Sequence, residues 1–350
     1  MIFWRCPRCG FKEGFWEGYF WRCPGCGSPL EIDYSPRYAV GSGRGFSRYS
    51  TTLPFTPERS RGEGSTPLVI ERFDGRDVLF KLEYLNPSGS FKDRGTSLAI
   101  YYAYRMGFRD VVEDTSGNTG ISVALYSRLY NLSARIFMPR TAPEGKKRIV
   151  RLLGAEVIET PTRSDAASKV LEYVDKSYYV AHTWNPLYII GASTIVYELY
   201  EDYGAPEAII APIGSGGLFL GLVRGFELLY KQGMISRMPR IIGVQGYSSQ
   251  PVYKTLKGYE VSGEDSYLAD GIMVQNPPRL REIIDVLRRY EGDIVLVGNS
   301  EIIDAQKDLL SLGFVVEPTS AVVWACYKKI RDRLDARSVL IPLTGSGLKI

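Results

Sequence analysis

Short apolar runs alternate with helical patterns along most of the chain. Runs typical of buried strands occur at residues 78–84, 110–113, 134–138, 155–159, 208–212, 240–246, 292–297 and 338–343. Stretches of helical length and spacing lie at residues 96–107, 119–131, 144–154, 166–177, 218–233, 300–313 and 318–334. This alternation predicts an α/β fold of parallel sheets with helices on both faces. Because ligands of such folds bind beyond the carboxyl ends of the strands, we expect the chemistry in the loops that follow them.

The length of the chain exceeds what one hydrophobic core usually holds. With 350 residues, we expect about two domains and a small appendage. Hydrophobic residues make up 45% and charged residues 23%, which is ordinary for a globular protein and argues against a disordered or fibrous chain. Residues 35–65 are rich in Ser, Gly, Pro and Arg, and they predict a linker with an irregular arm.

Charge and hydropathy argue against a membrane or a nucleic acid as a partner of the protein. No run of about 18 apolar residues occurs, so no membrane span is predicted. The first residues lack the basic and apolar regions of a secretory signal. The net charge of +4 is spread over scattered Lys and Arg residues, which is too weak to indicate nucleic acid. We therefore expect a cytoplasmic protein with no membrane or nucleic-acid partner.

Four of the five cysteines fall within the first 26 residues. They form two C-x2-C knuckles separated by 13 residues: Cys6, Cys9, Cys23 and Cys26. Two such knuckles supply the four thiolates of a structural zinc site. The alternative is a pair of disulfides, which a cytosolic chain disfavours. The fifth, Cys326, lies in an apolar segment and is interpreted as a small buried hydrophobe.

The chain contains one histidine, His182, which excludes any catalytic or metal site that needs two histidines. Attention therefore turns to lysine and hydroxyl chemistry. Lys92 follows the turn Asn86–Ser90 and precedes a predicted helix. The positive end of a helix dipole disfavours the charged ammonium, and a neutral amine is the form that attacks aldehydes. A solvated surface lysine is the alternative interpretation.

Three further loops join a predicted strand to a helix or lie after a strand. The first, residues 115–120 (TSGNTG), offers hydroxyls and backbone N–H groups that suit an anion, although simple helix capping is the alternative. The second, residues 214–217 (GSGG), is typical of a phosphate cradle, although a tight turn would use the same residues. The third begins at Thr344, after the last predicted strand, where a capping threonine is the alternative.

Together, the motifs NPSGSFKDRG, SGNTG, GSGG and TGSGLK resemble those of fold-type II pyridoxal-phosphate enzymes, most of all the threonine synthase family. They occur in the family's order, and the resemblance covers residues 65–350. It implies two doubly wound parallel-sheet domains plus the zinc-ribbon-like module. We expect the ribbon at residues 1–34, a large cofactor-binding domain from residues 35–95 and 185–350, and a small α/β domain at residues 96–184.

The resemblance also implies roles for individual residues. Lys92 would bind pyridoxal phosphate covalently and move the α-proton of the substrate. Ser116 and Thr119 would hold the substrate carboxylate. The remaining cofactor contacts would be Asn118 at the ring hydroxyl, Thr344 at the ring nitrogen, and Gly214, Ser215, Gly216, Gly217 and Leu218 at the phosphate. The expected cofactors are pyridoxal phosphate and a structural zinc ion, and relatives suggest a homodimer.

One segment departs from the family pattern. Threonine synthases commonly carry N-S-x-N-P-x-R, which grips the phosphate of O-phosphohomoserine. Here His182 and Thr183 replace the Asn-Ser pair, Asn185 matches, and Tyr188 stands where the arginine would be. The missing arginine removes a bidentate phosphate clamp. His182 could take part of that role, or it could be a structural histidine.

The leading hypothesis is a carbon–oxygen lyase of the threonine synthase type, which makes threonine and phosphate from O-phosphohomoserine and water. One alternative keeps the cofactor and changes the reaction to a threonine or serine dehydratase, or to β-replacement on serine, threonine or O-phosphoserine. A second alternative is a zinc-ribbon adaptor fused to a degenerate enzyme. The intact Lys92 argues against degeneracy.

Overall fold

The computed structural model describes residues 1–349, which form two compact units. The first unit contains residues Met1–Gly64, Asn86–Gly191 and Lys349, and the second contains Ser65–Leu85 and Ala192–Leu348. The domain borders expected from the sequence and the assignment of a cofactor-binding domain stay predictions. Within residues 1–349, no helix is both long enough and apolar enough to cross a membrane.

The first unit contains a parallel sheet of four strands in the order β8-β7-β6-β9. Its strands are β6 (Asp110–Asp114), β7 (Ser133–Pro139), β8 (Glu156–Thr160) and β9 (Tyr178–Tyr179). Its helices are α1 (Lys92–Arg105), α2 (Asn118–Leu129), α3 (Glu144–Leu152) and α4 (Arg163–Lys169). Alternate strand residues face opposite sides: Val111 and Ile136 pack with α1 to α3, whereas Val112 and Phe137 pack with α4. Helices on both faces explain why the middle residues of β6 and β7, such as Val111, Val112, Ile136 and Phe137, are all apolar and buried.

A separate antiparallel sheet of three short strands forms the N-terminal module, in the order β2-β1-β3. The strands are β1 (Phe3–Arg5), β2 (Lys12–Gly14) and β3 (Glu31–Asp33). A core of Trp4, Phe15 and Ile32 is buried beneath them. After this module comes the 3-10 segment η1 (Gly45–Thr52) within the predicted irregular arm.

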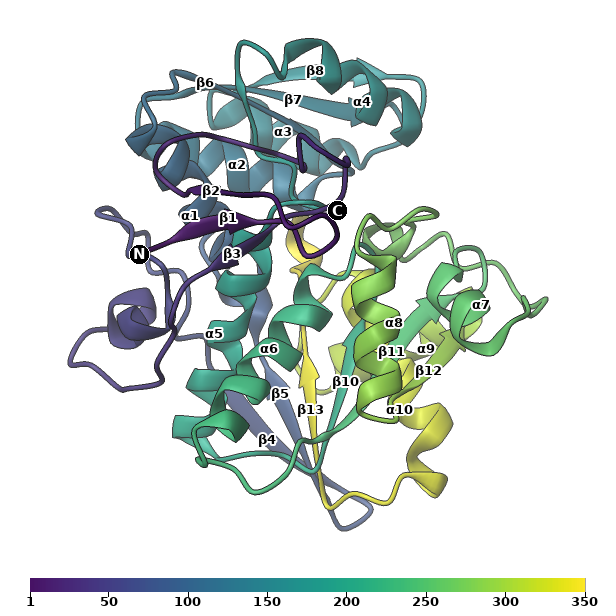
Figure 1. Cartoon of the computed structure of the whole chain (residues 1–350). Helices are drawn as coiled ribbons and strands as arrows, with labels where there is room; N and C mark the ends of the chain where they lie inside the picture. Colours follow the sequence, from purple (N-terminus) through teal and green to yellow (C-terminus); the bar gives the residue numbers. More distant parts are fainter. Residues whose placement is uncertain (350) are drawn as a thin grey trace. The chain divides into compact units, whose positions relative to one another are not determined.

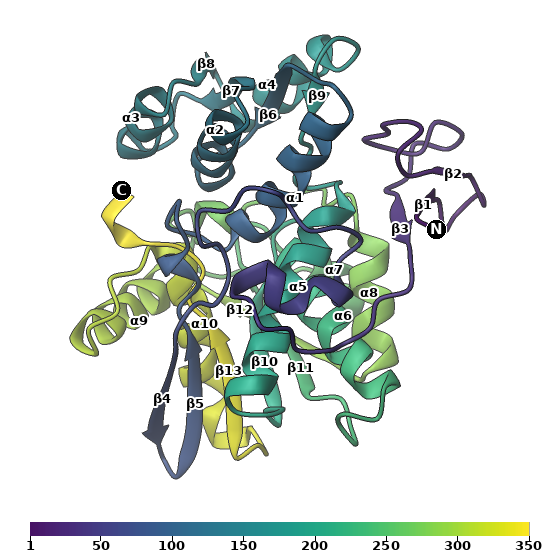
Figure 2. The ribbon, with the colours of Figure 1, turned by 90° about the vertical axis from the view of Figure 1, so that its left-hand side faces the viewer.

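The second unit is built on a sheet of six strands in the order β12-β11-β10-β13-β5-β4. The strands are β4 (Leu68–Phe73), β5 (Arg76–Lys81), β10 (Ala208–Pro212), β11 (Arg240–Gly246), β12 (Asp293–Val297) and β13 (Ser338–Pro342). The helices are α6 (Gly217–Lys231), α7 (Pro251–Lys257), α8 (Leu280–Arg289), α9 (Asn299–Ser311) and α10 (Pro318–Ile330). Figure 1 shows α6 and α8 in front of this sheet, and Figure 2 shows its strands β4, β5 and β13 side by side. Side chains of α9 and α10 pack on its other face.

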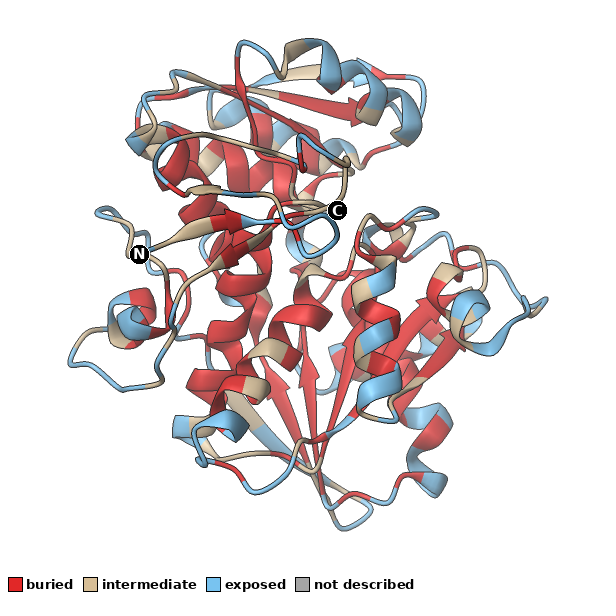
Figure 3. Cartoon of the chain, viewed as in Figure 1, coloured by how far each residue is buried: buried red, intermediate tan, exposed pale blue. Residues whose placement is uncertain are grey.

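The predicted α/β fold with parallel sheets is confirmed, and the structure adds elements that the sequence pattern did not predict. The edge strand β4 is antiparallel to β5. It was not predicted because polar residues such as Glu71 and Arg72 interrupt its apolar run. Helix α5 (Pro186–Asp202), which spans both units in sequence, was not predicted. It is apolar on nearly all sides and so lacks an amphipathic period. Figure 3 shows the central strands β10 and β13 of the six-stranded sheet as buried along their whole length.

Candidate functional site

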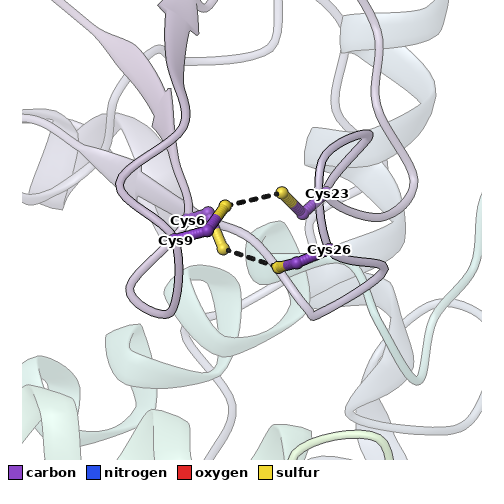
Figure 4. A group of neighbouring side chains, drawn as sticks. All are labelled: Cys6, Cys9, Cys23 and Cys26. Carbon is purple, nitrogen blue, oxygen red and sulfur yellow. Dashed lines mark hydrogen bonds between the residues drawn. The ribbon is translucent and has the colours of Figure 1, made fainter.

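The four N-terminal cysteines come together at one point between the two knuckles (Figure 4). Their Sγ atoms all lie within 4.8 Å of one another, with 3.5 Å between Cys6 and Cys26 and between Cys9 and Cys23. Tetrahedral zinc with bonds of about 2.3 Å to sulfur places neighbouring sulfur atoms about 3.8 Å apart. The donor set and its spacing therefore fit a structural zinc ion.

The two knuckles have equivalent backbone bonds. Gly10 N donates to Cys6 O at 3.1 Å, and Gly27 N donates to Cys23 O at 2.8 Å. The thiols differ in environment: burial raises the pKa of Cys23 to about 12, while hydrogen bonds from Ser28 lower the pKa of Cys26 to about 6. A bound zinc ion would deprotonate all four thiols, which removes this difference.

Aromatic side chains join the N-terminal module to the rest of the first unit. Tyr102 on α1 donates to Phe15 O at 2.9 Å, and the Tyr19 hydroxyl donates to the backbone oxygen of Tyr179 on β9. The ring centroid of Trp21 lies 5.5 Å from that of Tyr179 and 5.4 Å from that of Trp184. The module thus packs against strand β9 and the turn that follows it.

Lys92 is the first residue of α1 and is half-buried. Its neighbour Asp93 is fully buried and accepts hydrogen bonds from Ser88 N at 2.7 Å and Ser122 Oγ at 2.5 Å. Burial raises the pKa of Asp93 to about 6. Asp93 therefore ties the turn before Lys92 to helix α2, and it fixes the backbone from which the lysine projects.

The loop after β6 leads directly into α2, which begins at Asn118. Ser116 is half-buried and Thr119 is buried, and Gly117 N donates to Thr115 Oγ1 at 3.0 Å. The loop therefore sets small hydroxyls beside the first N–H groups of a helix, as an anion site requires.

Asn118 is held by a lysine that lies far away in sequence. Lys349 Nζ donates to Asn118 Oδ1 at 2.8 Å and to Gly89 O at 2.7 Å. A Cβ atom at Gly89 would lie 3.2 Å from Lys349 Cδ, and Gly89 has a left-handed φ of 79°. Because its oxygen accepts from the ammonium, the Asn118 amide would act toward a ligand through its NH2 group, as a hydrogen-bond donor.

The substrate-segment residues predicted from the sequence lie on one tight turn after β9. Trp184 N and Asn185 N both donate to Ala181 O, at 2.7 Å and 2.8 Å. The Asn185 amide donates to Val180 O and Tyr178 Oη, each at 3.1 Å, and it accepts from Leu187 N at 3.0 Å. Asn185 thus holds the turn together, while His182 and Thr183 on the same turn stay half-buried.

Tyr188, where the arginine was expected, is buried in the first turn of α5. Its hydroxyl forms a 2.8 Å hydrogen bond with Thr96 Oγ1. Gly95 allows the ring to lie against α1, because an added Cβ would come within 2.5 Å of the ring. Tyr188 therefore packs the two helices together and uses its hydroxyl within the protein.

In the second unit, the GSGG loop forms the predicted turn between β10 and α6. A Cβ atom at Gly214 would lie 2.8 Å from Gly271 O, and one at Gly216 would lie 2.6 Å from Ile283 Cδ1. Gly216 also has a φ of 96°, which favours glycine. Ser215 and Gly217 are half-buried, and Leu218 is buried in the first turn of α6. Close backbone approach at the start of a 15-residue helix fits a phosphate group.

Thr344 lies just beyond β13, also in the second unit, and is buried. Its hydroxyl forms a 3.0 Å hydrogen bond with Ser320 Oγ on α10, and Ser320 Oγ accepts from Gly345 N at 2.7 Å. The Ser320 hydroxyl can donate either to Thr344 or to Gly345 O, which is also 3.0 Å away. When it donates to Thr344, the Thr344 proton is available for the nitrogen of a pyridine ring.

The structure therefore groups the predicted residues by unit. The first unit holds Lys92, Ser116, Asn118, Thr119, His182, Thr183 and Asn185, and the second holds Gly214, Ser215, Gly216, Gly217, Leu218 and Thr344. Sequence analysis missed two polar residues of this region, Lys349 and Glu113. Lys349 was visible as the end of the TGSGLK motif, but Glu113 lies in a strand outside every motif, and only the fold brings it to His182.

Comparison with known proteins gives a consistent result. Residues 59–345 match the family model described as pyridoxal-phosphate dependent enzyme. The threonine synthase of Synechocystis sp. is 32% identical over 337 residues, which cover 92% of this chain and 87% of the relative. The threonine synthase of Methanocaldococcus jannaschii is 30% identical over 331 residues, covering 87% and 80%.

Solved structures share the fold. The O-acetylserine dependent cystathionine beta-synthase from Helicobacter pylori superposes with a TM-score of 0.70 at 26% identity, covering 82% of this chain and 94% of that one. Maize serine racemase superposes with a TM-score of 0.66 at 24% identity, covering 81% and 88%.

Proposed function

Because the chain belongs to the family of pyridoxal-phosphate dependent enzymes, we propose that it is a threonine synthase, which converts O-phosphohomoserine and water into threonine and phosphate. The observation that carries the proposal is the similarity to threonine synthases over nearly the whole chain. The geometry adds support, because the expected lysine begins a helix and the expected loops open α2 and α6.

When bound, pyridoxal phosphate supplies an electron sink for the carbanion chemistry. We assign Lys92 to hold the cofactor and to move a proton at the α-carbon of the substrate. Asn118 is assigned to the ring hydroxyl, to which its amide would donate, because its Oδ1 atom already accepts from Lys349. The cofactor phosphate is assigned to Gly214, Ser215, Gly216, Gly217 and Leu218, whose backbone leaves no room for a Cβ at two of these positions.

Thr344 is assigned to the ring nitrogen. A hydroxyl in that place leaves the nitrogen unprotonated and moderates the ring as an electron sink. For the substrate, Ser116 and Thr119 are assigned to the carboxylate, and His182 and Thr183 to the phosphate end. The Asn185 amide is used within its own turn, so its proposed contribution is the shape of that turn.

The remaining parts of the proposal concern the ribbon and the assembly. We assign a structural zinc ion to Cys6, Cys9, Cys23 and Cys26, on the spacing of their sulfur atoms. Residues 35–95 and 185–350 are assigned to the cofactor-binding domain, and residues 96–184 to the small domain. A cytoplasmic homodimer stays a prediction from the sequence.

The reaction is tested by incubating the holoenzyme separately with O-phosphohomoserine, threonine and O-phosphoserine. We expect stoichiometric phosphate and threonine from O-phosphohomoserine, and little 2-oxo acid from threonine. The buried Tyr188 in place of an arginine is the observation that favours the rival reactions. Ammonia and 2-oxo acid from threonine, without phosphate release from O-phosphohomoserine, would instead establish a dehydratase.

A second test concerns the lysine that holds Asn118. Lys349→Met removes the ammonium that binds Asn118 Oδ1 and Gly89 O. Loss of a charge-assisted hydrogen bond weakens such a site by about tenfold. We therefore expect the dissociation constant of pyridoxal phosphate to rise about tenfold and its absorption band to shift, both measured by titrating apoenzyme with cofactor. Lys257→Met, which breaks only a surface pair with Asp293, is the matched control and should leave both unchanged.

A further inference from the structure

A buried carboxylate lies behind the histidine of the substrate turn. Glu113, on β6, has a side chain with no exposed surface. Its Oε1 atom contacts His182 Nδ1, and its Oε2 atom is buried without a hydrogen-bond partner in the part of the chain that the structure describes. Buried polar atoms are rarely left unpaired, and a buried charge needs a partner. A fully buried glutamate with one unpaired oxygen is therefore a candidate for a functional role.

The strand places this side chain away from the neighbouring acid. Successive strand residues point to opposite faces. Asp114 accepts from Arg163 Nη1 at 2.5 Å and from the Tyr179 hydroxyl, so its charge is balanced on that face. Glu113 points to the other face, where its contact is the His182 ring. The two carboxylates thus have separate partners.

The backbone holds His182 in a defined position. Ala181, directly before it, has a φ of 52°, in the left-handed region that costs a non-glycine residue energy. The two hydrogen bonds to Ala181 O and the Asn185 amide fix this turn despite the strain. Because Glu113 engages Nδ1, the nitrogen that remains for a ligand is Nε2. The His182 side chain is 11% exposed, so the ring lies between the buried carboxylate and solvent.

We propose that Glu113 is a positioning residue that fixes the His182 ring through Nδ1, so that Nε2 donates a hydrogen bond to the phosphate of the substrate. This inference rests on the proposed function and extends it to a residue outside the motifs. It also explains how the site could bind phosphate without the arginine. The Tyr188 hydroxyl is hydrogen-bonded to Thr96, so His182 supplies the donor to the phosphate instead.

The protonation of the pair decides whether it attracts an anion. With two protons, the pair has no net charge and carries a hydrogen on Nε2; with one proton, it is negative and can present a lone pair there. Burial raises the pKa of Glu113 well above its ordinary value, which favours the proton that the neutral pair needs. Burial, together with the charges of Lys92 and Arg163, lowers the pKa of His182, so the imidazolium needs the nearby carboxylate.

The test compares Glu113→Leu with Glu113→Gln in the holoenzyme. Leucine keeps the approximate size and removes the contact with Nδ1, whereas the glutamine amide can donate to Nδ1 and keep the hydrogen on Nε2. For Glu113→Leu we expect the KM for O-phosphohomoserine to rise about tenfold with kcat changed less than about threefold. For Glu113→Gln we expect the KM to stay within about threefold of the native value. Glu159→Gln, on strand β8 of the same sheet and paired with Lys147, is the matched control.

A binding measurement separates this inference from the proposed function. Inorganic sulfate is titrated into the holoenzyme, in which the cofactor's own phosphate fills the loop of the second unit. Sulfate affinity should fall about tenfold in Glu113→Leu and in His182→Phe, and should be retained in Glu113→Gln. The His182→Phe variant keeps the test decisive should Glu113→Leu not fold.

The outcomes are distinct. An enzyme that releases no phosphate from O-phosphohomoserine contradicts the proposed function, while the sulfate titrations still test the pair. Tighter sulfate binding by Glu113→Gln than by the native enzyme would mean that the glutamate repels anions, and it would overturn the inference. The inference would also be overturned if the native, Glu113→Leu and His182→Phe enzymes bound sulfate with equal affinity, or if none of them bound it.

Discussion

Replacing Lys92 with alanine is expected to lower kcat by at least about 10³-fold and to remove the visible absorption of the bound cofactor. The amine is assigned two tasks: it attaches the cofactor and it moves the α-proton. Proton transfer by a positioned side chain alone contributes about 10²–10⁴-fold. Alanine keeps a good helix former at the first position of α1, so the fold should be unchanged. Absorption spectra, single-turnover kinetics and thermal unfolding of the same preparation check the three expectations.

The control is Lys176→Ala, because Lys176 is exposed at a turn after η3 (Val170–Tyr173). That variant should retain native absorption and kcat. After borohydride reduction, mass analysis of the native protein should find the cofactor on Lys92. An adduct on another lysine, or full activity in Lys92→Ala, would contradict the assignment of the cofactor site.

The sequence predicted the central strands well because they are buried on both faces. The run at residues 208–212 matches β10 residue for residue, and the run at 240–246 matches β11. Both lie inside the sheet of the second unit, where all of their side chains except that of Arg240 are buried. A continuous apolar run bounded by polar residues is then the expected signal.

Elements with a weaker pattern were missed for identifiable reasons. Strand β4 carries Glu71 and Arg72 because one of its edges has no partner strand in the sheet. Helix α8 (Leu280–Arg289) is strongly amphipathic, but it follows a long irregular segment. The alternation of strands and helices predicted no element in that part of the chain, so the helix was missed. In both cases the deciding information was the position of the element in the fold.

The candidate site shows the same division. The family resemblance inferred from the four loop motifs is confirmed, because residues 59–345 match the family model. Motifs located Lys92 and the loops, since these contain turn residues in a fixed order. Glu113 lies outside every motif, and the motif that contains Lys349 did not indicate its role. Each acts on a residue 69 or 231 positions away, and neither the strand pattern nor the turn chemistry records such a contact.

The second large effect is expected from removing a cysteine of the N-terminal module, which should lower both the stability of the protein and its affinity for substrate. Cys23→Ser replaces one of the four sulfur donors, and Cys23 is itself buried. Loss of a ligand lowers metal affinity by at least about 100-fold, which corresponds to about 2.7 kcal/mol of lost stabilisation. For a chain of this size we expect the Tm to fall by about 5 °C or more. Metal analysis should find one zinc ion per native chain and a substoichiometric amount in the variant.

Substrate binding should suffer more than cofactor binding, for a reason that lies in the packing. Trp21, two residues before Cys23, packs edge-to-face against Tyr179 and Trp184, and the Tyr19 hydroxyl donates to Tyr179 O. Strand β9 leads from Tyr179 into the strained turn that carries His182. A loosened knuckle therefore removes support from that turn, while the contacts of Asn118 with Lys349 stay intact.

We expect the KM of Cys23→Ser for O-phosphohomoserine to rise several-fold, with the dissociation constant of pyridoxal phosphate changed by less than about twofold. Cys326→Ala is the matched control, because it removes a buried thiol on α10 that lies outside the cysteine cluster. It should keep the zinc content and the native KM, although the small cavity will lower the Tm slightly. A Cys23→Ser enzyme with native zinc content and Tm would show that the four thiols do not form a metal site. A zinc-depleted variant with a native KM would show that the ribbon does not support the substrate turn.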